Sequence, residues 1–315
     1  MNKNIESELI SFDGSENELE TSRHAQRKMP DTTSQGHGDV FFISLGSGSS
    51  GNCAYLGTTR AGVLIDAGID PDIVFSTLRT NGVEPTAVKG IVLTHDHQDH
   101  VRYVYTTVRR YKHLRIYCTP KLLKGLLRRH NISRRVQEYQ ENIFKEIEFR
   151  LAGMTFTAFD TSHDGTDNMG FSIDVGDSHF VVATDMGYIT ERASYYMARA
   201  NYLMIEANYD RAMLDGGRYP EYLKNRVRGD VGHLDNVVAA NFVRDHYHAG
   251  LRYVFLCHLS KDNNTPALAR EAMLTALQHA GATVGDGSNA IDQRDRDVQL
   301  YALPRFDPSL CFVLQ

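Results

Sequence analysis

The segment THDHQDH (residues 94–100) follows directly on the apolar run GIVL (90–93), and it constrains the fold of this chain more than any other feature. It places three histidines and two aspartates within seven positions, where a buried strand is expected to end. Close polar groups beside a buried strand are costly to desolvate unless a cation compensates them. The segment therefore predicts a metal site built at a strand end.

Three further apolar runs, in FDTSHD, VVATD and VFLCH, also end in a potential metal ligand. Imidazole and carboxylate bind zinc, manganese and iron, and strand ends are rigid enough to hold the geometry of a metal site. A lone histidine at a strand end is usually a core or surface residue, but the 94–100 segment favours the ligand interpretation for these residues too. Seven ligands are enough for two cations that share a carboxylate. The predicted ligands are His95, His97, Asp99, His100, His163, Asp185 and His258.

The order of apolar runs predicts an α/β domain. Short runs rich in β-branched and aromatic residues occur in both halves, with helical patterns at 71–82, 190–200, 235–249 and 265–280. Strands followed by helices in both halves favour two sheets packed face to face, with helices outside. Residues 1–38 are polar and are expected to form a disordered tail, so the folded domain is expected to span 39–315.

A cytoplasmic location without membrane association is also expected. No run of about eighteen apolar residues is present, and the N-terminus is polar and acidic rather than a basic head with an apolar signal core. The four cysteines are scattered without a C-x-x-C pair, which suits a reducing compartment.

Charge is unevenly distributed along the chain. Residues 101–137 contain eleven lysines and arginines and no aspartate or glutamate, although the net charge of the chain is −5. Charge runs usually form a solvated face, but this one begins beside the metal motif and is interleaved with Tyr103, Tyr105, Tyr111 and Tyr117. We expect a basic face that attracts a polyanion, with tyrosines that either stack on bases or pack in the core.

The ligand series HxHxDH, His, Asp, His resembles that of the metallo-β-lactamase superfamily over roughly residues 39–310. The resemblance implies a four-layer αββα sandwich with a dinuclear site at one edge of the sheets. It also implies the division of the ligands: His95, His97 and His163 for one metal, Asp99, His100 and His258 for the other, and Asp185 as the bridge. The segments SLGSGSSGN, LIDAG, EANYD, YPEYLKNR, GHLDN and HLSKDNN resemble the YycJ/WalJ branch, a bacterial group regarded as 5'-to-3' DNA exonucleases.

The function implied by the resemblance is a metal-dependent phosphodiesterase, a 5'-to-3' DNA exonuclease with two divalent metal ions (Zn, Mn or Fe). Two cations about 4 Å apart can activate a water as hydroxide and clamp the attacking and leaving oxygens of a phosphodiester. Asp99 is expected to accept a proton from that water. Only 72 residues separate Asp185 from His258, which leaves no room for a large accessory domain. Nucleic acid is therefore expected to bind to this one domain or to a homodimer of it.

His233, in GDVGHLDN, resembles the histidine of the Gly-His-Ser-Thr motif of ribonuclease Z, which contacts the phosphate or assists the leaving oxygen. Leu234 and Asp235 stand in place of Ser and Thr, and the alternative is that Asp235 caps the next helix while His233 packs beside it. Glu206, at the end of YLMIE, either orients His233 or holds a metal-bound histidine. The expected catalytic residues are Asp99, His233 and Glu206.

Two loops are candidates for substrate contact. SLGSGSSGN lacks the Gly-Lys-Ser/Thr ending of a P-loop, and its Ser49 and Asn52 are expected to hydrogen-bond substrate or ligands, unless the glycines only serve a tight turn. Lys261 and Asn263 follow the last ligand and are expected to meet the phosphate, with a solvated loop as the alternative. Asp66 in LIDAG is expected to anchor the ligand loop.

Alternative functions stay open. A cyclic ribose phosphodiesterase of the PhnP type carries a cysteine-rich zinc site, which the scattered cysteines do not suit. A glyoxalase-like thioester hydrolase fits the ligand set but gives the basic stretch no role. A binding protein with a degenerate site is disfavoured, because the ligand series is intact.

Overall fold

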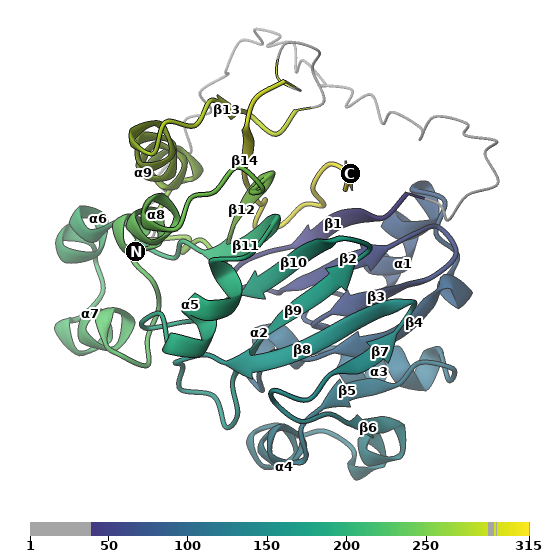
Figure 1. Ribbon diagram of the computed structural model, residues 1–315. Helices are drawn as coiled ribbons and strands as arrows, with labels where there is room; N and C mark the ends of the chain where they lie inside the picture. The colour runs from purple at the N-terminus through teal and green to yellow at the C-terminus, as the bar shows by residue number, and fades with distance from the viewer. Residues whose placement is uncertain (1–38, 289–292, 294, 315) are drawn as a thin grey trace, which may run out of the picture. The chain divides into compact units, whose positions relative to one another are not determined.

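Figure 1 shows the computed structural model, which describes residues 39–288, 293 and 295–314. The predicted disordered tail, residues 1–38, lies outside the described residues, so the tail and the domain boundary at 39 stay predictions. The described chain builds two sheets: one from the strands of the first part of the sequence together with the last strand of the chain, and one from the strands between them.

The first sheet has seven strands in the order β15-β1-β2-β3-β4-β5-β6. The strands are β1 (Phe41–Gly46), β2 (Cys53–Gly57), β3 (Gly62–Ile65), β4 (Val88–Val92), β5 (Ile116–Cys118), β6 (Gln140–Asn142) and β15 (Phe312–Val313). Strands β1 to β3 are antiparallel neighbours, whereas β3 to β6 run parallel. Nearly every residue of β3 and β4 is buried, as expected for central strands of a sheet covered on both faces.

The second sheet has eight strands in the order β13-β14-β12-β11-β10-β9-β8-β7. The strands are β7 (Phe149–Leu151), β8 (Met154–Asp160), β9 (Met169–Val175), β10 (Ser178–Ala183), β11 (Tyr202–Glu206), β12 (Tyr253–Cys257), β13 (Val284–Gly285) and β14 (Val298–Ala302). Strands β7 to β10 are antiparallel, and β10, β11, β12 and β14 run parallel.

Aromatic side chains join the inner faces of the two sheets. The ring centroid of Phe42 in β1 lies 5.0 Å from that of Phe180 in β10 and 4.8 Å from that of Phe255 in β12. All three side chains are fully buried. Removing each ring from water stabilises the fold by about 1.5–3 kcal/mol, so these contacts hold the sheets together as one core.

Helices cover the outer faces of both sheets (Figure 1). The helices of the described residues are α1 (Pro71–Thr80), α2 (Gln98–Val101), α3 (Val104–Arg110), α4 (Pro120–Arg129), α5 (Glu191–Met197), α6 (Arg211–Gly216), α7 (Glu221–Arg228), α8 (Asn236–Asp245) and α9 (Pro266–His279). Of these, α6 and α7 pack with Tyr209 in a separate small cluster. Helices α5, α8 and α9 share a buried cluster with strands β10 to β12 and β14. The predicted four-layer αββα sandwich is confirmed. Among the described residues, no helix combines the length and the hydrophobicity that a transmembrane span requires.

Strong local signals set the helix boundaries. Helix α1 begins after Asp70, whose carboxylate accepts a hydrogen bond from the Asp72 backbone N–H, and it has proline in its first turn. Helix α8 begins after Asp235, whose carboxylate accepts from the N–H groups of Val237 and Val238. The capping role that was considered for Asp235 as an alternative is therefore present, and it does not exclude a role for His233.

The strands that precede the predicted ligands end at one edge of the sandwich. Strands β8 and β10 both pair antiparallel with β9, so they point the same way, and β10, β11 and β12 are parallel. The loops that follow β4, β8, β10 and β12 carry His95–His100, His163, Asp185 and His258 respectively. The topology thus brings together residues that lie up to 163 positions apart in the sequence.

Candidate metal centre

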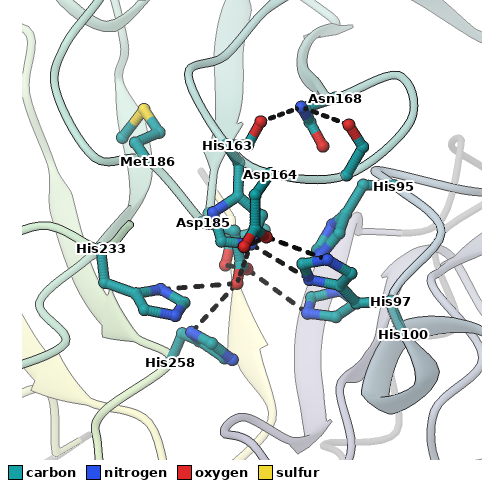
Figure 2. A network of polar contacts seen from close by, with 12 residues as sticks. His95, His97, His100, His163, Asp164, Asn168, Asp185, Met186, His233 and His258 are labelled. Carbon is teal, nitrogen blue, oxygen red and sulfur yellow. Dashed lines mark hydrogen bonds and ion pairs between the residues drawn. The ribbon is translucent and has the colours of Figure 1, made fainter. Parts of the chain in front are cut away.

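Six of the seven predicted ligands fall into two groups whose ligand atoms lie within 4.8 Å of one another, and Asp185 belongs to two further groups that overlap with these. The first two groups are His95, His97 and His163, and Asp99, His100 and His258. Asp185 lies between them: its Oδ2 is 3.3 Å from His100 Nε2, and its Oδ1 is 3.2 Å from His258 Nδ1 and 3.7 Å from His163 Nε2. Figure 2 shows its carboxylate with imidazole rings on both sides. This is the arrangement predicted for a carboxylate shared by two cations.

Three residues of the centre have left-handed backbone conformations. The φ angles are 61° at Asp66, 53° at Asp185 and 52° at His258. Such angles are uncommon for residues with a Cβ atom and cost of order 1–3 kcal/mol each. Asp66 and His258 follow directly on the ends of β3 and β12, and Asp185 lies two residues after the end of β10, so each strained residue turns the chain just beyond a strand.

Asp66 connects the end of β3 to the loop that carries the HxHxDH motif. Its carboxylate accepts hydrogen bonds from Thr94 N and Thr94 Oγ1, both at 2.8 Å, and lies 2.7 Å from His100 Nδ1. Thr94 Oγ1 is in turn 3.1 Å from His95 Nδ1. The predicted anchoring contact of Asp66 is present, and it orients His100 so that Nε2 faces Asp185.

His163 and His258 are oriented in the same manner. His163 Nδ1 lies 2.8 Å from the Gly232 carbonyl oxygen, and His258 Nδ1 lies 3.0 Å from Glu206 Oε1. An outer hydrogen-bond acceptor fixes the tautomer of a histidine and leaves the second nitrogen unprotonated for a metal. For both residues that second nitrogen is Nε2.

The side chain of His95 gives a direct indication that the centre is built for a cation. Its Nε2 is buried and has no hydrogen-bond partner among the described residues. Burial, together with the neighbouring imidazoles, holds the pKa of His95 well below its usual range, so the ring is neutral with an electron pair on one nitrogen. A buried lone pair without a partner is costly unless an electron-pair acceptor fills the space, and a divalent cation meets that requirement.

The carboxylates around the second ligand group stabilise positive charge on its imidazoles. Burial opposes ionisation of Asp99, but His100 and His258 outweigh it and lower the pKa of Asp99 to about 2. Burial also opposes protonation of His100, yet Asp185, Asp66 and Asp99 raise the pKa of His100 to about 9. Because only neutral imidazole binds a metal, a cation here would displace the proton that these carboxylates favour.

His233 and Glu206 lie beside the ligands, as predicted. Glu206 Oε1 lies 2.8 Å from His233 Nδ1 and 3.0 Å from His258 Nδ1, so both roles considered for this glutamate are compatible with its position. Its Oε2 accepts from the backbone N–H groups of Met186 and Leu234. Burial raises the pKa of Glu206, but His233 and His258 outweigh it and hold that pKa below the usual value.

A family model described as "Beta-lactamase superfamily domain" matches residues 62–259. The chain belongs to the metallo-β-lactamase superfamily.

Two relatives within the metallo-β-lactamase superfamily are similar over most of their length. Exodeoxyribonuclease YycJ of Bacillus anthracis is 30% identical over 262 residues, which cover 83% of this chain and 97% of that protein. Exodeoxyribonuclease WalJ of Streptococcus pneumoniae is 32% identical over 242 residues, which cover 76% of this chain and 89% of that protein. The resemblance to the YycJ/WalJ branch is therefore confirmed. The crystal structure of Zn²⁺-bound PqqB from Methylobacterium extorquens has the same fold, with a TM-score of 0.60 at 16% identity over 85% of this chain and 99% of that chain.

The glycine-rich loop of this metallo-β-lactamase fold lies against the second ligand group. Asn52 Nδ2 is 3.1 Å from Asp99 Oδ2 and 2.9 Å from His100 Nε2, so Asn52 contacts predicted ligands. Ser49 is exposed. A Cβ atom on the neighbouring Gly68 would lie 1.6 Å from the Asp99 carbonyl oxygen, so only glycine fits there.

The loop after His258 contains the other predicted substrate residues. Lys261 is exposed and available to solvent. Asn263 is only 1% exposed, and its amide is 3.4 Å from Ser260 Oγ, so its position disfavours the substrate contact predicted for it. Its burial follows from the loop folding back over α6: Asp210 donates its backbone N–H to the Asn263 carbonyl oxygen.

Two contacts of the centre were missed from the sequence. Ser47 Oγ, in the loop after β1, accepts a hydrogen bond from His258 N at 2.9 Å, which fixes the strained backbone of this predicted ligand from the opposite sheet. Asp164 Oδ1 lies 3.1 Å from His97 Nε2, and its Oδ2 accepts from Arg226 of α7. Asp164 follows His163 directly, and that adjacency is the only sequence signal that points to it.

The basic stretch folds into α3, β5, α4 and a short 3₁₀ helix. Two of its tyrosines are half-buried and contact other aromatic rings: the Tyr111 ring centroid lies 4.0 Å from that of Phe75, and the Tyr117 ring centroid lies 5.7 Å from that of Phe149. On α4, an exposed row follows a spacing of three and four residues, which places its members on one helix face. The row is Lys121, Lys124 and Arg128.

Proposed function

We propose that this chain is a metal-dependent phosphodiesterase that degrades DNA as a 5'-to-3' exonuclease. The observation that carries the proposal is the convergence of two ligand groups around Asp185. The names of the YycJ and WalJ relatives support DNA as the substrate. The cytoplasmic location and the homodimer stay predictions.

The ligand groups suit two divalent cations, either zinc, manganese or iron. When bound, such ions lower the pKa of water and neutralise the charge that develops on a phosphodiester during in-line displacement. Asp99 is ionised at neutral pH, because its pKa is about 2, and 19% of its side chain is exposed. Its carboxylate is therefore able to accept a proton from an attacking water.

His233 is the proposed donor to the leaving oxygen. Glu206 holds its Nδ1 at 2.8 Å, which leaves Nε2 for the substrate, and 19% of the His233 side chain is exposed. Its ring centroid lies 5.0 Å from that of His163 and 5.2 Å from that of His258. A phosphate held by both ligand groups would thus lie near this ring.

The cation row on α4 is the proposed path for the nucleic-acid backbone. Arg128 Nη2 lies 3.4 Å from Thr166 Oγ1, in the loop that follows His163, so the row begins beside the centre. It leads to a cleft of about 570 Å³ whose lining includes Lys121, Lys124, Lys145, the exposed ring of Phe144 and Asp167, which pairs with Lys121 and Lys145. Cations along a backbone path and an aromatic ring for stacking are typical of grooves that bind a single strand.

End-labelled linear DNA tests the proposal directly. Full-length protein loaded with Mn²⁺ or Zn²⁺ is expected to release nucleotides progressively from the 5' end, and Asp99→Ala is expected to abolish that release. Asp177→Ala, in the exposed turn between β9 and β10, is the matched control and should be as active as the unmodified chain.

Several outcomes contradict parts of the proposal. Release from the 3' end would refute the polarity. Hydrolysis of a cyclic ribose phosphate without action on DNA would move the assignment to a small-molecule phosphodiesterase. Cleavage of a thioester alone would move it to an acyl hydrolase.

A further inference from the structure

Four of the five histidines assigned as ligands have one ring nitrogen facing the centre and the other facing an outer oxygen. The outer oxygens belong to Thr94 for His95, Asp66 for His100, Gly232 for His163 and Glu206 for His258. His97 is the fifth histidine. Its Nδ1 lies 3.1 Å from His163 Nε2, so Nδ1 is the nitrogen that faces the first ligand group. Its Nε2 must then carry the proton and requires an acceptor.

Asp164 offers that acceptor. Its Oδ1 lies 3.1 Å from His97 Nε2 and 3.6 Å from His163 Nε2. The same oxygen is buried and has no hydrogen bond of regular geometry to any described residue. A small rotation of either side chain aligns Oδ1 with the Nε2 proton and satisfies both groups. Figure 2 shows the Asp164 carboxylate directed at the His97 ring.

Arg226 of α7 holds the other half of the Asp164 carboxylate. Its Nε and Nη2 donate to Oδ2 at 3.0 and 2.7 Å, which leaves Oδ1 directed toward His97. Arg129 of α4 donates to the Asp164 backbone carbonyl at 2.8 Å, so this residue is restrained from two helices. Helix α7 also contacts the centre through Val227, whose carbonyl oxygen accepts from His233 N.

We propose that Asp164 is a positioning residue that fixes the tautomer and orientation of His97, and that Arg226 keeps the Asp164 carboxylate in place. The inference rests on the ligand assignment of the proposed function. Helix α7 thereby has a role in the centre. Its Arg226 guanidinium orients Asp164, and Asp164 orients His97 of the first ligand group. Outer partners of this kind typically change metal affinity by about 10–100-fold when they are removed.

Cation affinity, measured without nucleic acid, is the test. The full chain is stripped of metal and titrated with Co²⁺ against a chelating indicator, while the cobalt d–d absorption reports the ligand geometry. Asp164→Ala is expected to weaken the binding of one cation by about 10–100-fold and to alter the spectrum. Asp164→Asn keeps an oxygen acceptor and should recover most of the affinity, and Arg226→Ala should show a partial loss.

Arg228→Ala is the matched control, because Arg228 lies on the same helix but pairs with Asp215 and Glu221. Its cobalt affinity should equal that of the unmodified chain. The proposal is overturned if Asp164→Ala binds cobalt as tightly as the unmodified chain. It is also overturned if Asp164→Asn loses as much affinity as Asp164→Ala, since Asp164 would then act as a charged ligand itself. If circular dichroism shows that Asp164→Ala is unfolded, the decision passes to Arg226→Ala. A cobalt affinity of Arg226→Ala equal to that of the unmodified chain then overturns the proposal. The cobalt titration contains no DNA. It therefore still tests the role of Asp164 if the protein proves inactive on DNA.

Discussion

Glu206 Oε1 lies within hydrogen-bonding distance of two imidazoles, at 2.8 Å from His233 Nδ1 and 3.0 Å from His258 Nδ1. One carboxylate oxygen thus contacts the proposed proton donor and a proposed ligand. The second oxygen fixes the backbone of Met186 and Leu234, which flank the loops after β10 and before α8. The glutamate therefore couples the position of His233 to that of the metal centre.

Glu206→Gln is expected to lower kcat on linear DNA by about 10–100-fold, since a neutral amide holds the His233 and His258 rings less firmly than a carboxylate does. The assay is initial rate at saturating Mn²⁺. Glu271→Gln, an exposed residue on α9, makes the same chemical change and should leave kcat unchanged. An unaltered kcat in Glu206→Gln would remove Glu206 from the mechanism.

Metal removal is expected to destabilise the fold. Without cations the centre holds buried carboxylates and imidazoles that compensate one another only in part. A ligand at 1,000 times its dissociation constant contributes about 4 kcal/mol per site, which corresponds to a rise in melting temperature on the order of 5–10 °C. Calorimetry with chelator and after restoring Zn²⁺ or Mn²⁺ measures this difference. Identical melting curves would argue against a cation at the centre.

Reversing charge on the α4 row should weaken DNA binding. Lys124→Glu and Arg128→Glu are each expected to lower the affinity for a single-stranded oligonucleotide and to reduce the slope of log K against log salt by about 1. Fluorescence anisotropy on the inactive Asp99→Ala background measures both quantities. Lys112→Glu, an exposed lysine of the same basic stretch after α3, is the control. Equal losses in all three variants would mean that net charge alone, and not this helix face, attracts DNA.

The cysteine thiols should resist modification in the native protein. Burial raises the pKa of Cys118 to about 12 and that of Cys311 to about 11, and it raises the pKa values of Cys53 and Cys257 as well. The thiolate is the reactive form, so a disulfide reagent at pH 8 should label all four quickly only after denaturation. Because the folded state retains these protons above the ordinary thiol pKa of 9.0, stability should fall as the pH rises beyond that value. Rapid native labelling would contradict the burial.

Gly68→Ala should disrupt the ligand loop. The added Cβ would lie 1.6 Å from the Asp99 carbonyl oxygen and 2.6 Å from Asn52 N, both backbone atoms that cannot move independently. Overpacking of this kind costs about 3 kcal/mol, and cation affinity should fall with it. Chemical denaturation measures the loss of stability. A Cβ on Gly216 would meet nothing within 4 Å, so Gly216→Ala should be close to neutral. Equal stability of the two variants would refute the close approach.

The convergence of the seven proposed ligands was predictable because its signals are local. Each ligand follows an apolar run that forms a strand, so the end of the run gives its position and the side chain gives its chemistry. The helices at 191–197, 236–245 and 266–279 were predictable for a similar reason, since each has an N-terminal cap and an apolar face. Helix α4 was not predicted, because its buried Leu122, Leu123 and Leu126 lie among lysines and arginines and the segment was interpreted by its charge.

The outer contacts were not predictable from local patterns. Arg226 meets Asp164 across 62 positions, and His258 meets Ser47 across 211 positions and between the two sheets. Neither pair has a spacing rule, because the contacts depend on how separate loops pack at the sandwich edge. The burial of Asn263 arises similarly, from a loop that folds back over α6.

Anomalous diffraction from crystals grown with Mn²⁺ would locate the cations themselves. We predict two anomalous peaks about 3.5–4 Å apart, one bound by His95, His97 and His163, the other by Asp99, His100 and His258, with Asp185 between them. A single peak, or peaks outside these two groups, would contradict the dinuclear centre and the phosphodiesterase assigned to it.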